Sequence, residues 1–303
     1  MMGRIGIECL SVFGLPPVEF VNLAADLGCA HIGIGLAPLP YNPHGYPRWS
    51  LRDDRALRRN SIAAMRDRGV SISLCEGFSI TSRNDVSAYA ADLEIAAELG
   101  GKRINVVSMD RDESRMFDQF ARIAEMADAL GIETTIEIGA GAVRRLPAAM
   151  AAVRHVGRPS FRLLIDTMHF VRAGGTAADI AAVDPDVIGY VQLCDAPLVS
   201  RFASYMDEAL HERMVPGTGE LPLLDIVAAV PEHVVLGLEV PQRSLAESGV
   251  GPRERLARCV DATRDLLSRV RRGQSGRGGP RVASVQPSAR AAASTGRKPG
   301  EPP

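Results

Sequence analysis

The stretch FRLLIDTMH, residues 161–169, decides the fold, because an apolar run of strand length stops there at one acid, Asp166. Three other runs have the same form: ETTIEIG (133–139) with Glu137, VIGYVQLCD (187–195) with Gln192 and HVVLGLEVP (233–241) with Glu239. The carboxyl ends of the strands of a parallel barrel meet at one face, so these four side chains would point into one hole. Three carboxylates and an amide in one hole are costly unless a divalent cation fills it. The sequence therefore predicts a metal-dependent enzyme on a parallel barrel.

The chain alternates regularly between strand-like and helical segments. Apolar runs of strand length lie near residues 4–9, 30–35, 70–76, 103–107, 132–138, 161–166, 186–193 and 233–240. Helical spacing of apolar residues lies between them, for example at 18–28, 56–69, 86–100 and 117–131. Eight strands alternating with helices predict parallel βαβ units. An open doubly wound sheet is the alternative, but SVFGLPPVEF (11–20) after the first strand lacks a Gly-rich phosphate motif. We therefore favour an α/β fold of the (β/α)8 TIM barrel type.

The last part of the chain differs in composition from the rest. A (β/α)8 barrel needs about 250 residues, and residues 1–270 are predicted to form one such catalytic domain. Residues 271–303 are rich in Gly, Pro, Ser and Arg and nearly lack large apolar groups. Such a segment cannot bury enough surface to offset its ordering, which predicts a disordered tail. We interpret the tail as inert, with a basic arm for an anionic partner as the alternative.

Charge and cysteine usage bound the class of protein. The net charge of -1 argues against nucleic acid and anionic membranes as partners. The five cysteines form no CxxC pair, which favours reduced thiols and a cytoplasmic location. The N-terminal residues do not resemble a signal peptide, and no run reaches the roughly 20 apolar residues of a membrane span.

The four strand-end residues Glu137, Asp166, Gln192 and Glu239 are the predicted metal ligands. Their hard oxygen atoms suit Mn²⁺ or Mg²⁺, and Co²⁺ is tolerable. Coordination positions left open would accept two oxygens of a hydroxy-ketone, whose carbonyl the ion would polarise. The expected substrate is therefore a small polyhydroxy ketone.

His169, Asp195 and Arg213 lie close to these ligands in sequence. His169 follows Asp166 by three residues and is interpreted as a ligand, a donor behind the ligands, or a general acid. Asp195 follows Gln192 by three and either binds substrate hydroxyls, orients a neighbour, or is an exposed turn residue. Arg213 precedes the tight loop 216–219, whose N–H groups are predicted to hold an anion or a hydroxyl beside the guanidinium, unless the loop is a plain turn.

Two further residues are assigned to substrate binding. Glu76 ends the third predicted strand and either contacts substrate, acts as a proton carrier, or is satisfied by a nearby arginine. His44 lies in PYNPHGYPRW (40–49), a loop of unusual aromatic density that contains the single Trp. This loop is interpreted either as a substrate lid or as a packed surface loop.

The chain resembles the xylose isomerase-like TIM barrels that include sugar phosphate isomerases and epimerases. The resemblance rests on IEIG with Glu137, IDTMH with Asp166 and His169, VQLCD, RMVPGTGELPL (213–223) and LGLEVP with Glu239. It implies that Glu137 and Glu239 flank the substrate and move protons as well as hold metal, with His169 as acid and Arg213 as substrate clamp. Barrels of this kind often form homodimers.

The resemblance implies a metal-dependent isomerase or epimerase that acts on a sugar-like hydroxy-ketone through an enediolate. Ketose 3-epimerases of the family carry His as the third ligand, where this chain has Gln192. Gln at that position resembles the bacterial 3-dehydroshikimate dehydratases, so a dehydratase of that type or of the inosose type is the alternative. An endonuclease IV-like hydrolase fits less well, because its zinc cluster needs more His ligands than the six histidines supply. A barrel without catalytic activity is the remaining alternative.

Overall fold

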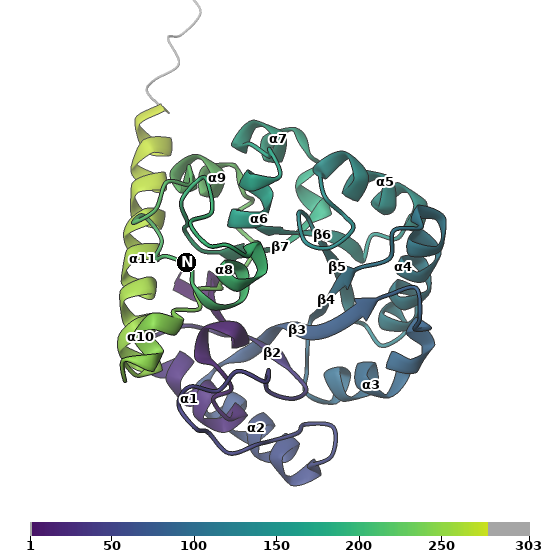
Figure 1. The fold of residues 1–303 in the computed structure, drawn as a ribbon, viewed down its shortest axis with the longest axis horizontal. Coiled ribbons are helices and arrows are strands. Elements are labelled where there is room, and N and C mark those ends of the chain that lie inside the picture. Colours follow the sequence, from purple (N-terminus) through teal and green to yellow (C-terminus); the bar gives the residue numbers. More distant parts are fainter. Residues whose placement is uncertain (1, 278–303) are drawn as a thin grey trace, which may run out of the picture.

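Eight parallel strands close into a barrel in chain order (Figure 1). The computed structural model describes residues 2–277 of the chain. Each strand pairs in parallel with the next, and β1 pairs in parallel with β8. The predicted (β/α)8 TIM barrel is therefore confirmed. The strands are β1 (Ile5–Glu8), β2 (His31–Gly35), β3 (Ser71–Ile80), β4 (Arg103–Ser108), β5 (Glu133–Glu137), β6 (Phe161–Asp166), β7 (Ile188–Leu193) and β8 (Leu236–Leu238).

Helices surround the ring of strands (Figure 1). The α-helices are α1 (Pro17–Asp26), α2 (Arg55–Arg68), α3 (Ala90–Glu98), α4 (Glu113–Asp128), α5 (Leu146–Val156), α6 (Thr167–Arg172), α7 (Ala177–Ala182), α8 (Tyr205–His211), α9 (Leu223–Ala229), α10 (Arg243–Glu247) and α11 (Pro252–Arg277). Short 3-10 turns are η1 (Met2–Arg4), η2 (Cys9–Val12), η3 (Val86–Tyr89) and η4 (Pro185–Val187). The four helical stretches expected from apolar spacing all correspond to helical segments.

Helix α4 illustrates how the outer layer is fixed. The side chain of Asp112 accepts a hydrogen bond from the backbone N–H of Arg115 and so satisfies one free donor of the first turn. Met116, Phe120 and Ile123 recur at helical spacing and are all buried. The ring of Phe120 lies 5.7 Å from that of Phe161 at the start of β6. Burying each such side chain contributes about 1.5–3 kcal/mol, so this face holds the helix against the barrel.

The interior of the barrel contains a buried acid that the sequence analysis does not assign. Glu8, the last residue of β1, accepts a hydrogen bond from the hydroxyl of Tyr190 at 2.6 Å, and that hydroxyl lies 3.0 Å from Ser73 Oγ. A Cβ atom at Gly33 or Gly237 would overlap the Glu8 carboxyl group, so these two glycines make room for it. A polar layer therefore lies inside the barrel, among the strands that carry the predicted site.

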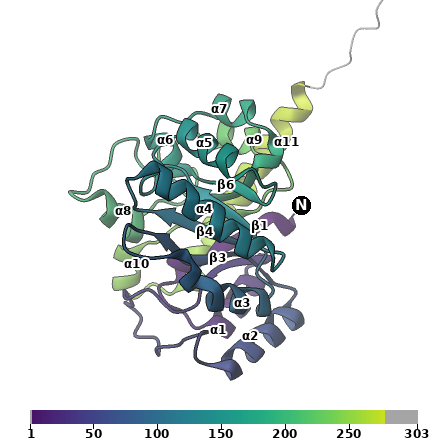
Figure 2. The ribbon, with the colours of Figure 1, turned by 90° about the vertical axis from the view of Figure 1, so that its right-hand side faces the viewer.

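The loops that follow the strands gather at one end of the barrel. Figure 2 shows α8 and the loop before it projecting on the side away from the N-terminus. Helix α8 lies in the long connection between β7 and β8 and contributes residues to the mouth of the barrel. Loops at this end position active sites in TIM barrels.

The C-terminal helix passes the domain boundary predicted at residue 270. Helix α11 continues to Arg277, so the predicted disordered tail does not begin at 271. Residues 278–303, which form the rest of that tail, lie outside the described residues. Within residues 2–277, no helix has both the length and the apolar character needed to cross a membrane.

Candidate metal centre

A cavity of about 870 Å³ opens at the carboxyl ends of the strands. Its lining includes five of the site residues predicted from the sequence: Glu76, Glu137, His169, Arg213 and Glu239. These come from β3, β5, α6 and the segments around β8, which are far apart in the sequence. Barrel closure is therefore what brings them together.

Asp166 is held at the end of β6 by two kinds of donor. Its Oδ1 atom accepts a hydrogen bond from the backbone N–H of His169 at 2.9 Å and so caps α6. Its Oδ2 atom accepts from Nη1 of Arg213. The same guanidinium contacts Oε2 of Glu239 at 3.1 Å through Nη2. Asp166, Arg213 and Glu239 form what we call the arginine-paired half of the site.

Glu137 and Glu76 lack such a partner. Nδ2 of Asn105, on β4, donates to Oε2 of Glu137 at 3.1 Å and lies 3.4 Å from Oε2 of Glu76. Nε2 of Gln192 donates to Oε1 of Glu76 at 3.0 Å. No arginine or lysine forms an ion pair with either acid among residues 2–277. Glu76, Asn105 and Glu137 form what we call the amide-paired half.

Gln192 joins the two halves. Its Nε2 atom also donates to Oε1 of Glu239 at 3.0 Å, so one amide nitrogen serves an acid on each side. Its Oε1 atom is buried and has no hydrogen-bond partner in the described structure. A buried amide oxygen without a donor is costly, and a hard cation would satisfy it.

The pKa values of the acids in the site shift in different directions. Burial, together with the nearby Asp166 and Glu76 charges, raises the pKa of Glu137 to about 8. Burial also raises the pKa of Glu76 to about 8, with Glu8 adding to the shift. Burial alone would raise the pKa of Asp166 as well, but Arg213 and His169 lower it to about 2. The guanidinium thus holds Asp166 ionised while Glu137 retains its proton near neutral pH.

One guanidinium cannot neutralise the whole cluster. Burial raises the pKa of Glu239 well above its ordinary value, even though Arg213 opposes the shift. The cluster therefore contains four carboxyl groups but a single arginine, which pairs with two of them. This imbalance is the arrangement that a divalent cation corrects, because its charge would keep all four carboxylates ionised.

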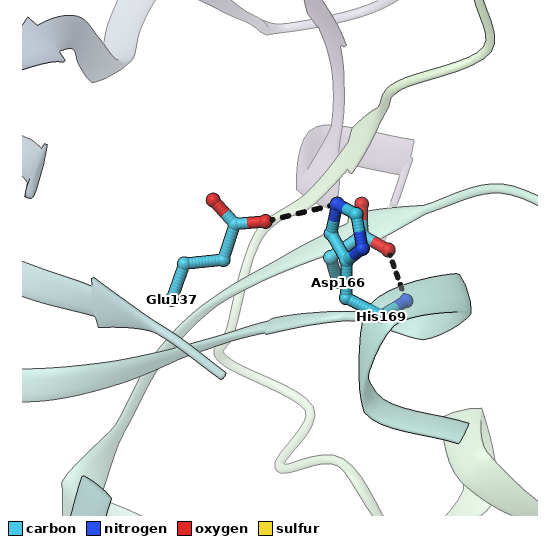
Figure 3. Close-up of side chains that lie close together, drawn as sticks. All are labelled: Glu137, Asp166 and His169. Carbon is cyan, nitrogen blue, oxygen red and sulfur yellow. Dashed lines mark hydrogen bonds and ion pairs between the residues drawn. The ribbon is translucent and has the colours of Figure 1, made fainter. Parts of the chain in front are cut away.

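A compact group of possible ligands lies at the centre of the cluster. Glu137, Asp166 and His169 each offer one ligand atom within 4.8 Å of the others. Figure 3 shows the Glu137 carboxylate and the His169 ring facing each other, with Asp166 beneath the ring. Nε2 of His169 lies 3.5 Å from Oε1 of Glu137. The residues present fit a divalent ion, with Gln192 and Glu239 bonded to the same network. Among residues 2–277 this group contains one histidine, unlike the histidine-rich zinc cluster of the hydrolase alternative.

His169 is held by a residue that the sequence analysis does not assign. Its Nδ1 atom contacts the hydroxyl of Tyr205, the first residue of α8. Burial lowers the pKa of His169 to about 4, so the ring is neutral at pH 7. Its Nε2 atom lies 3.4 Å from Nη2 of Arg213 as well as near Glu137. The Tyr205 hydroxyl can donate or accept, so the ring can present Nε2 either with or without a proton.

Arg213 lies where a substrate clamp was expected, but protein groups occupy its donors. Nε donates to the carbonyl of Ala209 at 2.8 Å, Nη1 faces Asp166 and the sulfur of Cys194, and Nη2 faces Glu239 and His169. Arg213 thus acts as the positive charge of the cluster in this structure. Direct contact with substrate stays a prediction.

Asp195 does not line the cavity, where substrate contact was expected. Its Oδ2 atom accepts hydrogen bonds from the backbone N–H groups of Gly217 at 2.8 Å and Gly219 at 2.9 Å. Its Oδ1 atom accepts from the backbone N–H of Leu221 at 3.1 Å. The loop 216–219 therefore does bind an anion, as its sequence predicts, but the anion is the chain's own Asp195. Asp195 is buried and orients this neighbouring loop, so it is not an exposed turn residue, and substrate contact stays a prediction.

His44 also lies away from the residues that line the cavity, where substrate contact was expected. Its ring lies 5.4 Å from that of Tyr46, and burial lowers its pKa. Trp49 from the same loop does line the cavity, and its Nε1 donates to the carbonyl of Gly14 at 3.0 Å. The loop thus forms one wall through Trp49, while His44 packs within the loop.

Asn105 and Tyr205 are site residues that sequence reasoning missed. Asn105 lies inside the apolar run RINVVS of β4, and a polar residue in a strand buried on both faces is a usable signal. Tyr205 lies in a long segment without strand pattern, so nothing in the sequence indicates its contact with His169.

Comparison with known proteins places this architecture in a family. The family described as xylose isomerase-like TIM barrel matches residues 21–265. The chain belongs to this family. The resemblance inferred from the strand-end motifs is therefore confirmed, and family members that share the barrel differ in what they do with it.

Solved structures of similar fold include the IolI protein with a bound zinc atom, at 14% identity and a TM-score of 0.72 over 88% of this chain and 99% of that one. A fusion of a xylose isomerase-like TIM barrel with 4-hydroxyphenylpyruvate dioxygenase is 20% identical, with a TM-score of 0.71 over 93% of this chain and 45% of that one. L-ribulose 3-epimerase is 17% identical, with a TM-score of 0.65 over 94% of this chain and all 100% of that one. At these identities the likeness shows the fold alone.

One curated protein matches at the level of sequence. It is the 3-dehydroshikimate dehydratase of Pseudomonas putida, 25% identical over 121 residues, which are 39% of this chain. The match spans 19% of that relative's length.

Proposed function

We propose that this protein is a divalent-metal-dependent isomerase or epimerase that removes a proton α to the carbonyl of a sugar-like hydroxy-ketone. The observation that carries the proposal is the cluster at the strand ends, where four carboxyl groups share one guanidinium that pairs with only two of them, and an amide oxygen has no donor. Glu137, Asp166, Gln192 and Glu239 would hold the ion, with His169 as a further candidate ligand. Mn²⁺ or Mg²⁺, or Co²⁺ in their place, would polarise the substrate carbonyl and acidify the adjacent C–H.

Glu137 and Glu239 are the proposed proton carriers. The strands before them, β5 and β8, are separated by β6 and β7 on one side of the closed ring, so the two carboxyls approach the mouth from different directions. A bound cation would keep both carboxylates ionised, so either could accept the proton α to the carbonyl. Removal of a proton by one and return by the other gives epimerisation, whereas return at the neighbouring carbon gives isomerisation.

His169 is the proposed donor to the substrate oxygen on which negative charge develops. The neutral ring can present its Nε2 proton into the cavity while Nδ1 accepts from the Tyr205 hydroxyl. Asp166 fixes the start of the helix that carries His169, so the ring position depends on the same residue that Arg213 keeps ionised. A donor held in advance requires no reorganisation during the reaction.

A dehydratase is the second candidate, favoured by Gln192 at the position where the family's ketose 3-epimerases carry His. The 25% identity to a 3-dehydroshikimate dehydratase over 121 residues points the same way. Its first step is the same proton removal, followed by loss of a β-hydroxyl as water.

The free thiols of all five cysteines fit the cytoplasm as the place of action.

The experiment incubates the Mn²⁺-loaded protein with ketoses and cyclic polyol-ketones in D₂O. Solvent deuterium at the α-carbon with unchanged composition supports the isomerase or epimerase, and a product lighter by one water supports the dehydratase. The Glu239→Gln variant is compared with Glu19→Gln, an exposed control on α1. Absence of both exchange and dehydration across the panel would contradict the proposal.

A further inference from the structure

The cavity is lined by positive charges as well as by the acids of its floor. Five arginines line it: Arg52, Arg144, Arg145, Arg172 and Arg213. Three of them are bonded to acids within the protein. Arg52 pairs with Asp92 through two hydrogen bonds at 2.7 and 2.8 Å. Arg172 pairs with Glu208 at 2.7 and 2.9 Å.

Arg144 and Arg145 are different. Both are exposed, and within residues 2–277 neither forms an ion pair or a side-chain hydrogen bond. They are neighbours in the loop between β5 and α5, which begins directly after Glu137. Two adjacent guanidinium groups at the edge of one cavity repel each other unless an anion lies between them.

The loop that carries them is firmly anchored. The backbone N–H of Ala142 donates to the carbonyl of Ser108 at the end of β4 at 2.6 Å, and that of Gly139 donates to the carbonyl of Val143 at 2.8 Å. Gly141 has a φ of 60°, and a Cβ there would overlap the Ser108 carbonyl. The side chain of Val143 is only 2% exposed. The arginine pair therefore extends from a base fixed to the barrel, next to the strand that supplies Glu137.

The charges of the cavity are thus sorted by depth. The floor gathers the buried acids Glu137 and Glu239 and the half-buried Glu76, whereas the rim at the β5–α5 loop presents two cations that have no partner among residues 2–277. A ligand that fills this cavity meets a site for a carbonyl at one end and a site for a negative group at the other.

We propose that Arg144 and Arg145 bind a carboxylate or phosphate group of the substrate, whose ketone end faces the acidic floor. The proposal rests on the proposed function for the placement of the ketone. It narrows the substrate class from neutral polyhydroxy ketones to anionic ones. Guanidinium groups recognise both anions through paired N–H donors, which makes them suited to this task.

The test uses two pairs of ketones, and the members of each pair differ by one anionic group. 5-Keto-D-gluconate is L-sorbose with a carboxylate in place of its terminal CH₂OH. D-fructose 6-phosphate is D-fructose with a phosphate ester on its terminal hydroxyl. Binding of the four probes is measured calorimetrically on the full-length chain loaded with Mn²⁺, at low and at high salt. The variants are Arg144→Gln, Arg145→Gln and the double variant, with Arg59→Gln on the exposed face of α2 as the matched control.

We expect the anionic member of one pair to bind about tenfold more tightly than its neutral partner, as one exposed charge-assisted contact provides. The double variant should remove that preference, high salt should weaken it, and Arg59→Gln should leave it unchanged. A preference within the first pair identifies a carboxylate site, and one within the second a phosphate site. Equal binding within both pairs, no binding of either anion, or a preference that survives in the double variant would overturn the proposal. Deuterium exchange into neutral ketoses but into no anionic ketone would also overturn this proposal, while it would leave the proposed function intact.

Discussion

The arginine-paired half of the site contains an acid whose pKa is lowered, Asp166, whereas both acids of the amide-paired half, Glu76 and Glu137, have raised pKa values. Asp166, beside Arg213, has a pKa lowered to about 2. Glu137, on the neighbouring strand, has a pKa raised to about 8 by burial and by the nearby Asp166 and Glu76 charges. Both acids are buried, so burial alone does not explain why their pKa values shift in opposite directions. The guanidinium of Arg213, which is bonded to Asp166, explains the difference.

This difference identifies what the site lacks. Arg213 stabilises Asp166 but leaves Glu76, Glu137 and Glu239 with raised pKa values. A second source of positive charge would stabilise the ionised form of these three acids. It would also provide a partner for Oε1 of Gln192, which lies between the two. The predictions below alter one half at a time.

The largest expected effect follows from removing the acid of the amide-paired half. Glu137→Gln keeps the shape of the side chain but eliminates the proton carrier, so deuterium exchange into the best ketose should fall by about 10³-fold. Mn²⁺ titration of the same variant should show weaker binding, because one anionic ligand is lost. Glu19→Gln on the surface of α1 is the control and should match the wild type in both measurements. Full exchange in Glu137→Gln would remove this residue from the chemistry.

Arg213→Met should leave Asp166 and Glu239 without a bonded arginine, as Glu76 and Glu137 are in the wild type. Removing one partner of a buried ion pair costs about 3–5 kcal/mol, since Asp166 and Glu239 lose their cation. Mn²⁺ should then raise the free energy of unfolding of the variant by more than it raises that of the wild type, as measured by urea denaturation. Arg172→Met breaks the buried pair with Glu208 and is the matched control. The same Mn²⁺ increment in both variants would show that Arg213 and the metal do not share ligands.

The two halves also differ in how they respond to pH. The pKa values of Glu76 and Glu137 are raised from 4.5 to about 8, so the native state holds protons that the unfolded chain has released. The stability of the metal-free protein should therefore fall as pH rises from about 4.5 through about 8. Asp166 acts in the opposite sense, because its lowered pKa contributes stability that is lost only as pH falls from 3.8 through about 2.

Thermal unfolding at a series of pH values, with and without Mn²⁺, measures this effect. The stabilisation by Mn²⁺ should grow as pH rises across the same interval, because metal binding requires deprotonated ligands. A metal-free protein that becomes steadily more stable from pH 5 to about pH 8 would contradict the raised pKa values.

The smallest expected effect concerns His169, which contacts both halves. Tyr205→Phe removes the hydroxyl at Nδ1 and should lower kcat about fivefold, which corresponds to the roughly 1 kcal/mol of one hydrogen bond. KM should change little, and the dependence of kcat on pH should shift because the ring loses a partner. Tyr89→Phe, whose hydroxyl contacts Ser79 away from the cavity, is the control. Unchanged kcat and pH dependence in Tyr205→Phe would show that Tyr205 does not position His169.

The barrel and its strand ends could be predicted from the sequence because each signal is local. A parallel strand covered on both faces is an unbroken apolar run, so the acid that ends the run is visible, as at Asp166 and Glu137. The spacing between Asp166 and His169 also determines a local contact, the cap of α6.

Residues whose roles depend on long-range contacts could not be assigned in this way. The distance of three residues from Gln192 says nothing of the direction in which Asp195 points, and it points to the backbone of loop 216–219. Tyr205 reaches His169 from a helix 36 residues further along the chain. Arg213 was expected to face the substrate, but only the closed barrel reveals that two strand-end acids surround it.

Anomalous X-ray scattering from crystals soaked in Mn²⁺ tests the central claim most directly. The account predicts one Mn²⁺ at the strand ends, bound by oxygens of Glu137, Asp166, Gln192 and Glu239, with the Gln192 amide oxygen directed at the ion. A cavity floor without Mn²⁺, with Asp166 and Glu239 still paired to Arg213 and Glu137 bound to Asn105, would contradict it.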